Sequence, residues 1–340
     1  MAIPKKILLV VLTLFMLLVG TAFFLPSRVL VERTVDIGAS PTTLFTMLNG
    51  FRMFNKWSPW SELTPEVRYV YSGPEFGVGA KMSWKSNDPN LVSGSQEIIE
   101  SKSAEFVRST LNFEDQGTST TFFKLVGQET QTKVTWGFEM ELGVHPVDRY
   151  LGLMMDSMLG DEYAKGLAAL KQLAEDLPKT DFSDLEPEIT EVKAKPIAYF
   201  STASSQDRQA IEHAMRKGYT QISAFMKSRQ LLQAGAVLAI AIQRDDRAYV
   251  FDLAIPLDQA PHENIPVKSP VKIRQSYAGK IVKAIHRGSH HKLRVTYDKL
   301  LAFAAAYGFD RNGYPWEEYL SDLGDTPESD LITIINLPVK

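Results

Sequence analysis

The hydrophobic pattern of the chain begins with one long apolar run and then changes to shorter alternating and helical stretches. The run extends from Ile7 to Leu25, and its only polar interruptions are Thr13 and Thr21. Their hydroxyls can hydrogen-bond back to the carbonyls of a helix, and about 20 apolar residues are enough to cross the hydrocarbon core of a bilayer. We therefore predict that residues 1–28 form a membrane anchor.

A cleaved secretory signal is the alternative interpretation of this run. Lys5 and Lys6 would suit its basic start, but residues 21–26 offer no pair of small residues at the cleavage spacing, so an uncleaved anchor is favoured. Positive charge is slightly in excess before the run. The bias predicts a cytoplasmic N-terminus and, in a bacterium, a single-pass protein of the inner membrane with its domains in the periplasm. The absence of cysteine is compatible with that compartment.

The remainder of the chain is too long for one hydrophobic core, so two domains are expected. Residues 178–192 contain acidic residues and two prolines where the preceding helical pattern stops. We interpret this segment as a linker between a domain at 29–177 and another at 193–340. A surface loop inside one large domain is the alternative.

Composition excludes several classes of function. The chain is 44% hydrophobic and 23% charged with a net charge of −3, which is ordinary for a globular protein and lacks the basic footprint of a nucleic-acid-binding one. The sequence has no glycine-rich phosphate loop, no H-E-x-x-H pair and no G-x-S-x-G turn. His286, His290 and His291 are close in sequence, but no carboxylate or thiol completes a familiar metal spacing. We predict no cofactor, no metal and no nucleic-acid partner.

The segment 29–177 combines strands with a long terminal helix. A strand and a helix start at Ser40-Pro41 precede a series of strand-like runs up to residue 141. From Pro146 to Leu177 the pattern is helical, with one apolar face that begins at Val147, Leu151, Met154 and Met158, and Gly160 marks a shift of that face. The prediction is an antiparallel, curved sheet that wraps a helix and can leave a cavity between them.

Three stretches of this segment resemble a known superfamily: FNKWSPW (54–60), GVGAKMSW (77–84) and GDEYAKGLAALKQLAED (160–176). They are similar to the START-related, polyketide cyclase/dehydrase-like SRPBCC proteins. The resemblance implies a helix-grip fold with a deep apolar pocket, which different members use for lipids, hormones or aromatic substrates. Aromatic and methionine residues at these spacings are also typical of plain core. The candidate pocket residues are Trp84, Trp136, Phe138, Met154 and Met158, together with Phe113, Phe122 and Met155.

The segment 193–340 shows the order strand, helix, strand, strand twice. The first set covers residues 196–256, with its helix at 206–232, and the second covers 276–339, with its helix at 290–307 and Gly308 as its stop. No residue-level period accompanies the repetition, so it predicts a structural duplication. The expected fold class of the whole chain is α+β, with an N-terminal transmembrane helix.

The stretches AIHRGSHHKLRVTYDKLLAFAAAYGF (284–309), GYPWEEYLSD (313–322) and TPESDLITIINLPVK (326–340) resemble the gyrase-inhibitor-like domain, which is also the effector-binding module of AraC-type and multidrug-responsive regulators. The family motif of proline, aromatic, glutamate, any residue and tyrosine stands here at residues 315–319. The resemblance implies a two-fold cleft between the repeats, with a carboxylate among aromatic rings. One departure is the turn at 286–290, which lacks the usual aromatic residue.

Physical chemistry gives this motif a meaning of its own. An ionised glutamate in an apolar cleft is costly, and a cationic ligand would restore its partner while the rings add about 0.5–2 kcal/mol of cation–π attraction. Strand alternation places Glu317 with Tyr319 and Trp316 with Glu318, and the motif selects Glu317 as the inward residue. The alternative is a pair of exposed acids on an edge strand. The candidate ligand-binding residues are Glu317, Tyr319, Trp316, Tyr249, Tyr277 and Tyr297.

The sequence thus predicts a membrane-tethered protein that binds small molecules at two sites. One site would take an apolar or lipid-like ligand and the other an amphipathic ligand, for which a cation is the best fit. An enzyme that hydrolyses or cyclises a reactive small molecule, with Glu317 and Tyr319 as acid and base, is the rival hypothesis. A third hypothesis is an adaptor protein of the cell envelope. No DNA-reading helix pair precedes the second domain, which argues against a transcription regulator.

Overall fold

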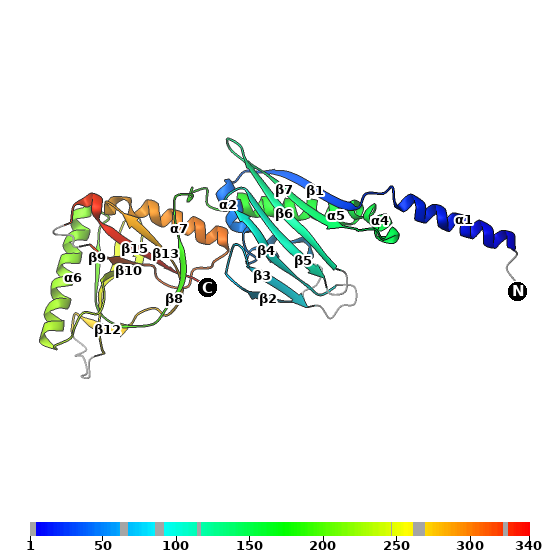
Figure 1. Ribbon diagram of the computed structural model, residues 1–340. Coiled ribbons are helices and arrows are strands. Elements are labelled where there is room, and N and C mark those ends of the chain that lie inside the picture. Colours follow the sequence, from blue (N-terminus) through cyan, green and yellow to red (C-terminus); the bar gives the residue numbers. More distant parts are fainter. Residues whose placement is uncertain are drawn as a thin grey trace. The chain divides into compact units, whose positions relative to one another are not determined.

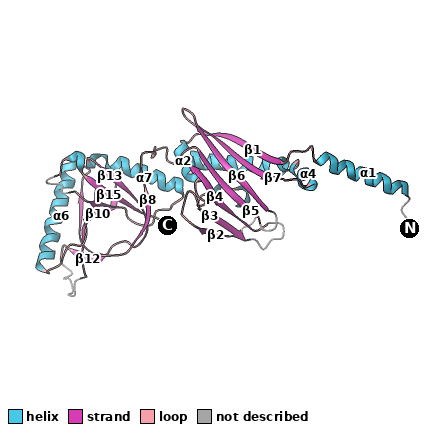
Figure 2. Ribbon diagram, in the orientation of Figure 1, coloured by secondary structure: helices cyan, strands magenta, loops and turns pink. Residues whose placement is uncertain are grey.

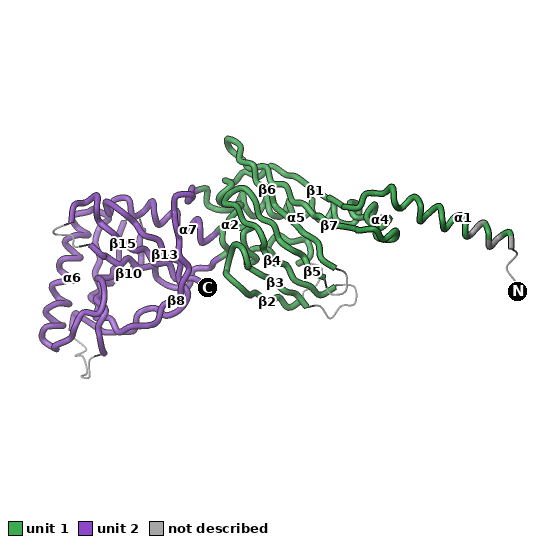
Figure 3. Tube along the Cα trace, viewed as in Figure 1, with its two compact units in different colours: residues 1–179, 306–308 green, residues 180–305, 309–340 purple. Residues whose placement is uncertain are grey.

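A computed structural model shows two compact units, each built on its own antiparallel sheet (Figure 3). The structure describes residues 5–61, 67–85, 92–113, 117–245, 247–260, 269–321 and 326–340. The first unit comprises residues 1–179 with 306–308, and the second comprises residues 180–305 with 309–340. The mixed α+β class predicted from the sequence is confirmed.

The first unit contains a seven-stranded sheet in the order β1-β7-β6-β5-β4-β3-β2 (Figure 1). Each strand from β2 to β6 pairs with the next along the chain, and β1 closes the meander against β7. The register sets Val31 opposite Phe138 and Arg33 opposite Trp136. The strands are β1 (Arg28–Ile37), β2 (Arg68–Ser72), β3 (Lys81–Lys85), β4 (Gly94–Lys102), β5 (Phe106–Phe113), β6 (Gly117–Gly127) and β7 (Thr132–Glu141).

The helices of the first unit follow the sequence signals closely, with one break. At the start of α2 (Pro41–Leu48) the Thr43 amide donates a hydrogen bond of 3.1 Å to the Ser40 hydroxyl, as an N-cap residue followed by proline predicts. Short helical turns follow at α3 (Phe54–Trp57) and η1 (Pro59–Ser61). The predicted long helix is two helices, α4 (Pro146–Gly152) and α5 (Met155–Glu175). The break lies at residues 153–154, and Gly160 sits inside α5.

The N-terminal run forms α1 (Lys5–Ala22). The hydroxyl of Thr13 donates to the Leu9 carbonyl at 2.9 Å and that of Thr21 to the Leu17 carbonyl at 2.8 Å, which confirms the predicted back-bonding. Within the described residues, no helix has both the length and the apolar character required to cross a bilayer, so the predicted transmembrane anchor is not supported. Residues 1–4 and the side chains at positions 5, 7, 8, 10 and 11 lie outside the described part.

The second unit contains an eight-stranded sheet in the order β12-β9-β11-β10-β14-β15-β13-β8. The sets β9-α6-β10-β11 and β13-α7-β14-β15 enter this sheet in inverted order, as a two-fold rotation would place them. The first, third and second strands of one set meet the second, third and first strands of the other. This symmetry confirms the predicted duplication. The strands are β8 (Glu188–Val192), β9 (Pro196–Ser204), β10 (Val237–Arg244), β11 (Tyr249–Pro256), β12 (Lys272–Gln275), β13 (Gly279–Arg287), β14 (Trp316–Tyr319) and β15 (Ile332–Pro338).

Two edge strands of this sheet lie outside the predicted repeats. β8 falls within the segment interpreted as a linker and pairs with β13, so residues 188–192 belong to the second unit's sheet. β12 pairs with β9 on the opposite edge. Both are short, which is typical of strands that end a sheet.

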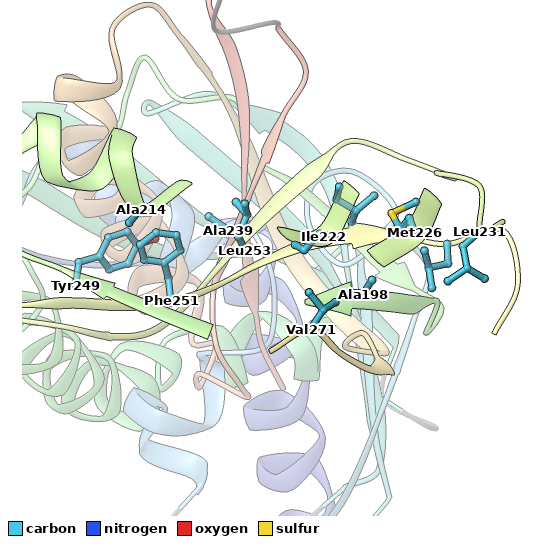
Figure 4. Close-up of a cluster of buried hydrophobic side chains, with 12 residues drawn as sticks. Ala198, Ala214, Ile222, Met226, Leu231, Ala239, Tyr249, Phe251, Leu253 and Val271 are labelled. Atoms are coloured by element: carbon cyan, nitrogen blue, oxygen red, sulfur yellow. The ribbon is translucent and has the colours of Figure 1, made fainter. Parts of the chain in front are cut away.

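The helices α6 (Arg208–Ser228) and α7 (Leu293–Tyr307) lie beside this sheet (Figure 2). Ala214 and Ile222 of α6 pack on Ala239, Phe251 and Leu253 of the central strands. Figure 4 shows this cluster, with the rings of Tyr249 and Phe251 side by side beneath Ala214. The opposite face of the sheet carries a separate apolar cluster, made of Ile197, Leu238, Ala254, Ile281 and Trp316.

Candidate functional site

Glu317 occupies the centre of the second unit's sheet. Its strand β14 lies between β10 and β15, and in register Glu317 faces Ala239 on one side and Ile335 on the other. Both neighbours are fully buried, and Glu317 itself is only 3% exposed. Because strand alternation puts Glu317 on the face covered by the helices, this carboxyl group is buried where the sequence predicted it.

The carboxyl group of Glu317 has one phenol as its hydrogen-bond partner. The hydroxyl of Tyr319 donates to Glu317 Oε2. Within the described residues no basic side chain forms an ion pair with Glu317. Burial raises the pKa of the Glu317 carboxyl, while the hydrogen bond from Tyr319 and the charge of Arg244 act in the opposite direction. The site therefore holds an acid whose ionisation is disfavoured by desolvation and only partly compensated.

Two further phenols lie close to this carboxyl group. The hydroxyls of Tyr249 and Tyr297 are buried without a hydrogen-bond partner. Burial raises the pKa of both phenols, and the negative charge of Glu317 raises it further. Tyr297 is near enough to Glu317 to affect the pKa of both groups, although its hydroxyl completes no hydrogen bond. Buried polar groups without partners are rare in native structures and call for an explanation at each site.

Arg244 and Phe251 both contact the ring of Tyr249. The Tyr249 and Phe251 rings stack with centroids 4.5 Å apart, and the Arg244 guanidinium lies 4.8 Å from the Tyr249 ring centre. Sequence reasoning missed Arg244. Arg244 pairs with Tyr249 in the register of β10 and β11. The sequence alone does not show that register, so it could not place Arg244 at this site.

The histidines near this site are hydrogen-bonded. His290 lies edge-on to the Tyr319 ring at 5.3 Å, and its Nε2 is 3.1 Å from the Thr333 hydroxyl. His286 is buried, with Nε2 3.0 Å from the Ser289 carbonyl, to which it donates, and Nδ1 2.8 Å from the Thr296 hydroxyl. Burial lowers the pKa of His290, and His286 and Arg208 lower it further. No group of three metal-binding side chains occurs in the described part of the chain.

Trp316 and Tyr277 lie on the opposite face of the sheet from Glu317, as strand alternation predicted for Trp316, so neither of these candidate residues lines the Glu317 site. Their ring centroids are 5.9 Å apart, and Trp316 Nε1 donates to Glu318 Oε1 at 3.1 Å. The physical reason for Trp316 is the period of two in a strand, since neighbouring residues point to opposite faces. The structure therefore brings together Glu317, Tyr319, Tyr249 and Tyr297.

Two surface pockets stand out among the described residues, and Glu317 lines neither. The pocket in the second unit, of about 230 Å³, is lined by Asp184, Leu185, Ile285, His286, Arg287, Lys292, Val295, Thr296 and Lys299. Since Glu317 is almost completely buried, a ligand would have to displace neighbouring side chains to reach the carboxyl group.

The first unit has a tightly packed aromatic core between its sheet and α5. The rings of Trp136 and Tyr163 stack 3.9 Å apart, and Trp57 and Trp60 contact Trp136 edge-on at 5.3 and 5.6 Å. Trp136 Nε1 donates to the Thr121 hydroxyl at 2.9 Å. These rings occupy the region where the helix-grip resemblance predicted a cavity.

The remaining predicted pocket residues do not share one environment. Phe138 is buried in the core, and Trp84 is half-buried with its Nε1 donating to the Val92 carbonyl at 2.9 Å. Phe122 lies against Gly137. Met154 and Met158 are exposed, which corrects their prediction as liners of an interior cavity. A pocket of about 170 Å³ lies instead at the α4 end of this unit, lined by Pro26, Arg28, Val29, Leu30, Val31, Leu142, Arg149, Gly152, Leu153 and Asp156.

Family models match the two segments separately. Residues 28–175 match the model described as polyketide cyclase / dehydrase and lipid transport, and residues 185–340 match the model described as GyrI-like small molecule binding domain. The chain carries a polyketide cyclase-like domain followed by a GyrI-like domain. Both resemblances identified from the sequence are thereby supported, and the two matches support the binding of small molecules.

Solved structures similar to either domain are known. The C-terminal domain of EcmrR is 14% identical, with a TM-score of 0.41, and the match covers 46% of this chain and 98% of that domain. An uncharacterised conserved protein from Listeria innocua is 16% identical, with a TM-score of 0.37 over 46% of this chain and 92% of that one. A norcoclaurine synthase point mutant from Thalictrum flavum is 12% identical, with a TM-score of 0.34 over 43% of this chain and 94% of that one. A comparison with curated protein sequences gives no significant match.

Proposed function

We propose that the GyrI-like domain binds an amphipathic cation against Glu317. The observation that carries this proposal is a buried carboxyl group surrounded by three phenols and lacking a cationic partner in the described residues. A ligand cation supplies that partner, and the rings of Tyr249, Tyr297 and Tyr319 attract it through their electron-rich faces. The two unpartnered hydroxyls then have polar atoms of the ligand to contact.

Closure of the cleft fits a ligand that opens its own site. Tyr249 and Tyr319 fill the space next to Glu317, so binding requires these rings to rotate outward. Such a rearrangement costs free energy, which a cation recovers by stabilising the ionised carboxylate in a low-dielectric site. Neutral ligands of the same shape lack this compensation, and the site therefore selects for positive charge.

Equilibrium dialysis with tetraphenylphosphonium tests the proposal, with the lipophilic anion tetraphenylborate as the matched control. We expect the cation to bind and the anion to bind far more weakly. The Glu317→Gln variant should lose at least tenfold in affinity for the cation, while Glu318→Gln on the opposite face should keep it. Absence of cation binding by the wild-type chain, or equal affinity for both ions, contradicts the proposal.

An enzymatic role for the same site is supported by one contact, the hydrogen bond between Tyr319 and Glu317. Burial raises the pKa of the Glu317 carboxyl group and so favours its protonated form, which can donate a proton, as can the phenol of Tyr319. The two functions separate in the Glu317→Gln variant. A variant that keeps ligand affinity but loses turnover of a reactive ester supports catalysis, whereas loss of cation affinity alone supports binding.

For the polyketide cyclase-like domain we propose an apolar or lipid-like ligand. The core is filled by rings, so the supporting feature is the pocket of about 170 Å³ at the α4 end. Val29, Leu142 and Leu153 give it an apolar wall. Native mass spectrometry after gentle extraction should retain a bound lipid, and Leu142→Asp should release it. A protein that carries no lipid in either form contradicts this proposal.

We also propose that α1 attaches the chain to a membrane, with its N-terminus in the cytoplasm and both domains in the periplasm. The support is a set of apolar side chains along α1 that are exposed. Exposure of so much apolar surface to water is unfavourable, and contact with lipid would remove it from water. Alkaline carbonate extraction of bacterial membranes tests the attachment, and protease added to intact spheroplasts tests the orientation. Release of the protein by carbonate contradicts the attachment, and protection of both domains contradicts the orientation.

A further inference from the structure

The stretch from Val144 to Met158 exposes an apolar face that nothing in the described chain covers. Val147, Leu151, Met154 and Met158 follow the helical spacing of three and four residues, and their exposed fractions are between 54% and 61%. Periodicity alone predicted that this face would turn toward the core. The structure turns it outward, because the aromatic core is filled by residues that come from later in α5 and from the sheet.

Other exposed apolar residues gather at the same end of the domain. They are Val144, Leu153, Phe23, Phe24 and Leu30, and Phe24 is 92% exposed. Large contiguous apolar patches are uncommon on soluble monomers and mark interaction surfaces. We define the α4 surface as residues 144–158 together with Phe23 and Phe24.

A hydrogen-bonded corner fixes the α4 surface to the end of α1. Arg149 Nη1 donates to the carbonyls of Ala22, Phe23 and Leu25 at 3.3, 3.1 and 3.2 Å. The Tyr150 hydroxyl donates to the Leu18 carbonyl at 2.9 Å. Ala22 is the last residue of α1 and Phe23 and Leu25 follow it, so Arg149 binds the backbone at the point where the helix ends. The two helices therefore meet at a defined angle rather than through a loose linker (Figure 1).

We propose that the α4 surface is a second lipid contact, which lies in the headgroup region of the same bilayer that α1 meets. The proposal rests on the attachment through α1. Phe23 and Phe24 directly follow α1, whose residues from Leu12 to Leu18 also expose apolar side chains, and Arg149 holds the α4 surface against this end of the helix. An apolar helix that lies in the interface needs no membrane-crossing length, and Arg and Tyr side chains suit this depth.

The lipid contact has a consequence for the pocket in this domain. Leu153 belongs both to the α4 surface and to the wall of the 170 Å³ pocket, together with Val29 and Leu142. The pocket therefore lies beside the bilayer, where a lipid can enter it without passing through water. The class of ligand that this position favours is an acyl chain.

Single-cysteine labelling tests the proposal directly, because the chain contains no cysteine. Leu151→Cys and Met158→Cys, each labelled with an environment-sensitive fluorophore, are reconstituted as full chains in vesicles that contain nitroxide-labelled phospholipid. Phe15→Cys on α1 reports the attachment itself. Val126→Cys is the matched control, since it is exposed on the same domain but the register places it at the opposite end of the sheet from Arg28.

We expect strong quenching at positions 151, 158 and 15 and little at 126. Quenching at 15 with none at 151 and 158 overturns the inference but leaves the attachment intact. Absence of quenching at all four positions overturns both. A blue-shifted but unquenched label at 151 shows that a protein, such as a second copy of the chain, covers the surface, and this outcome also overturns the inference.

Discussion

Trp136 and Tyr163 stack face to face, with ring centroids 3.9 Å apart and an angle of 12° between the ring planes. The pair joins strand β7, which lies next to the edge strand β1, to the long helix α5, and both side chains are 2% exposed. This contact packs the sheet against the helix in the region where the helix-grip resemblance predicted a cavity.

Removal of the indole at this contact should destabilise the first domain strongly. Trp136→Ala leaves a cavity and removes the hydrogen bond that the indole donates to Thr121, so we expect the free energy of unfolding to fall by about 3–5 kcal/mol. Urea unfolding followed by tryptophan fluorescence measures this change, because four of the five tryptophans belong to this domain. Val70→Ala, at an exposed position on β2, should change it by less than about 0.5 kcal/mol. Equal effects of the two substitutions would contradict the interpretation.

Gly137 is required by a close ring contact on the other face of β7. A Cβ atom added at this position would meet the Phe122 ring at 2.2 Å. We expect Gly137→Ala to cost about 1–3 kcal/mol of stability through overpacking. In a Phe122→Ala background the same substitution should cost much less, because the clashing ring is gone. A double-mutant cycle by urea unfolding measures the coupling, and additive effects would refute the contact.

Ionisation of Glu317 should make the GyrI-like domain less stable as pH rises. Burial raises the pKa of this carboxyl above its ordinary value of 4.5, so the folded state binds more protons than the unfolded state. Its contribution to stability is complete below pH 4.5 and is lost as pH rises through the folded-state pKa. Glu317→Gln removes this loss and should be more stable than wild type at neutral pH. The exposed Glu186→Gln is the control, and parallel stability–pH curves for wild type and Glu317→Gln would sink the prediction.

Protonation of His290 should make the GyrI-like domain less stable as pH falls into the mildly acidic range, in contrast to the ionisation of Glu317, which acts as pH rises. Burial, His286 and Arg208 lower its pKa below the ordinary 6.5, whereas Glu328 and Glu212 raise it less. The unfolded state then binds more protons, so the contribution of His290 is present above pH 6.5 and is lost as pH falls through the folded-state pKa. His290→Gln should flatten the fall in melting temperature between pH 7.5 and 5. The exposed His145→Gln should leave the fall unchanged, and an unchanged profile in His290→Gln would count against the mechanism.

The elements of both domains were predictable because their patterns are local. The capped start at Ser40, the meander of strands and the repeated strand–helix–strand–strand order each depend on residues that are close in sequence. The face of Glu317 was also predictable, since β14 needs only alternation. The periodicity of apolar residues locates an apolar face on a helix but does not show what that face packs against. Met154 and Met158 show this limit, because the same stripe suits a core, a cavity or a surface that meets lipid.

Which side chains fill the two predicted pockets could not be predicted, because it depends on packing between residues that are distant in sequence. Trp60, Trp136 and Tyr163 come from three separate elements, and only their assembly shows that no space is left between them. Arg244 reaches the Glu317 site through a strand register that the sequence does not display. Trp316 was assigned to the motif by resemblance, although its side chain points to the other face.

Because an unpaired buried carboxyl group lowers the stability of the empty domain, binding of the proposed cationic ligand should make the folded protein last longer. Any cation that binds the folded GyrI-like domain and not the unfolded chain raises the free energy of unfolding, by about 2.7 kcal/mol when the ligand is at 100 times its dissociation constant. A loaded molecule then opens less often and resists proteolysis longer than an empty one. The abundance of the protein in a cell would rise with its ligand, without any change in its synthesis.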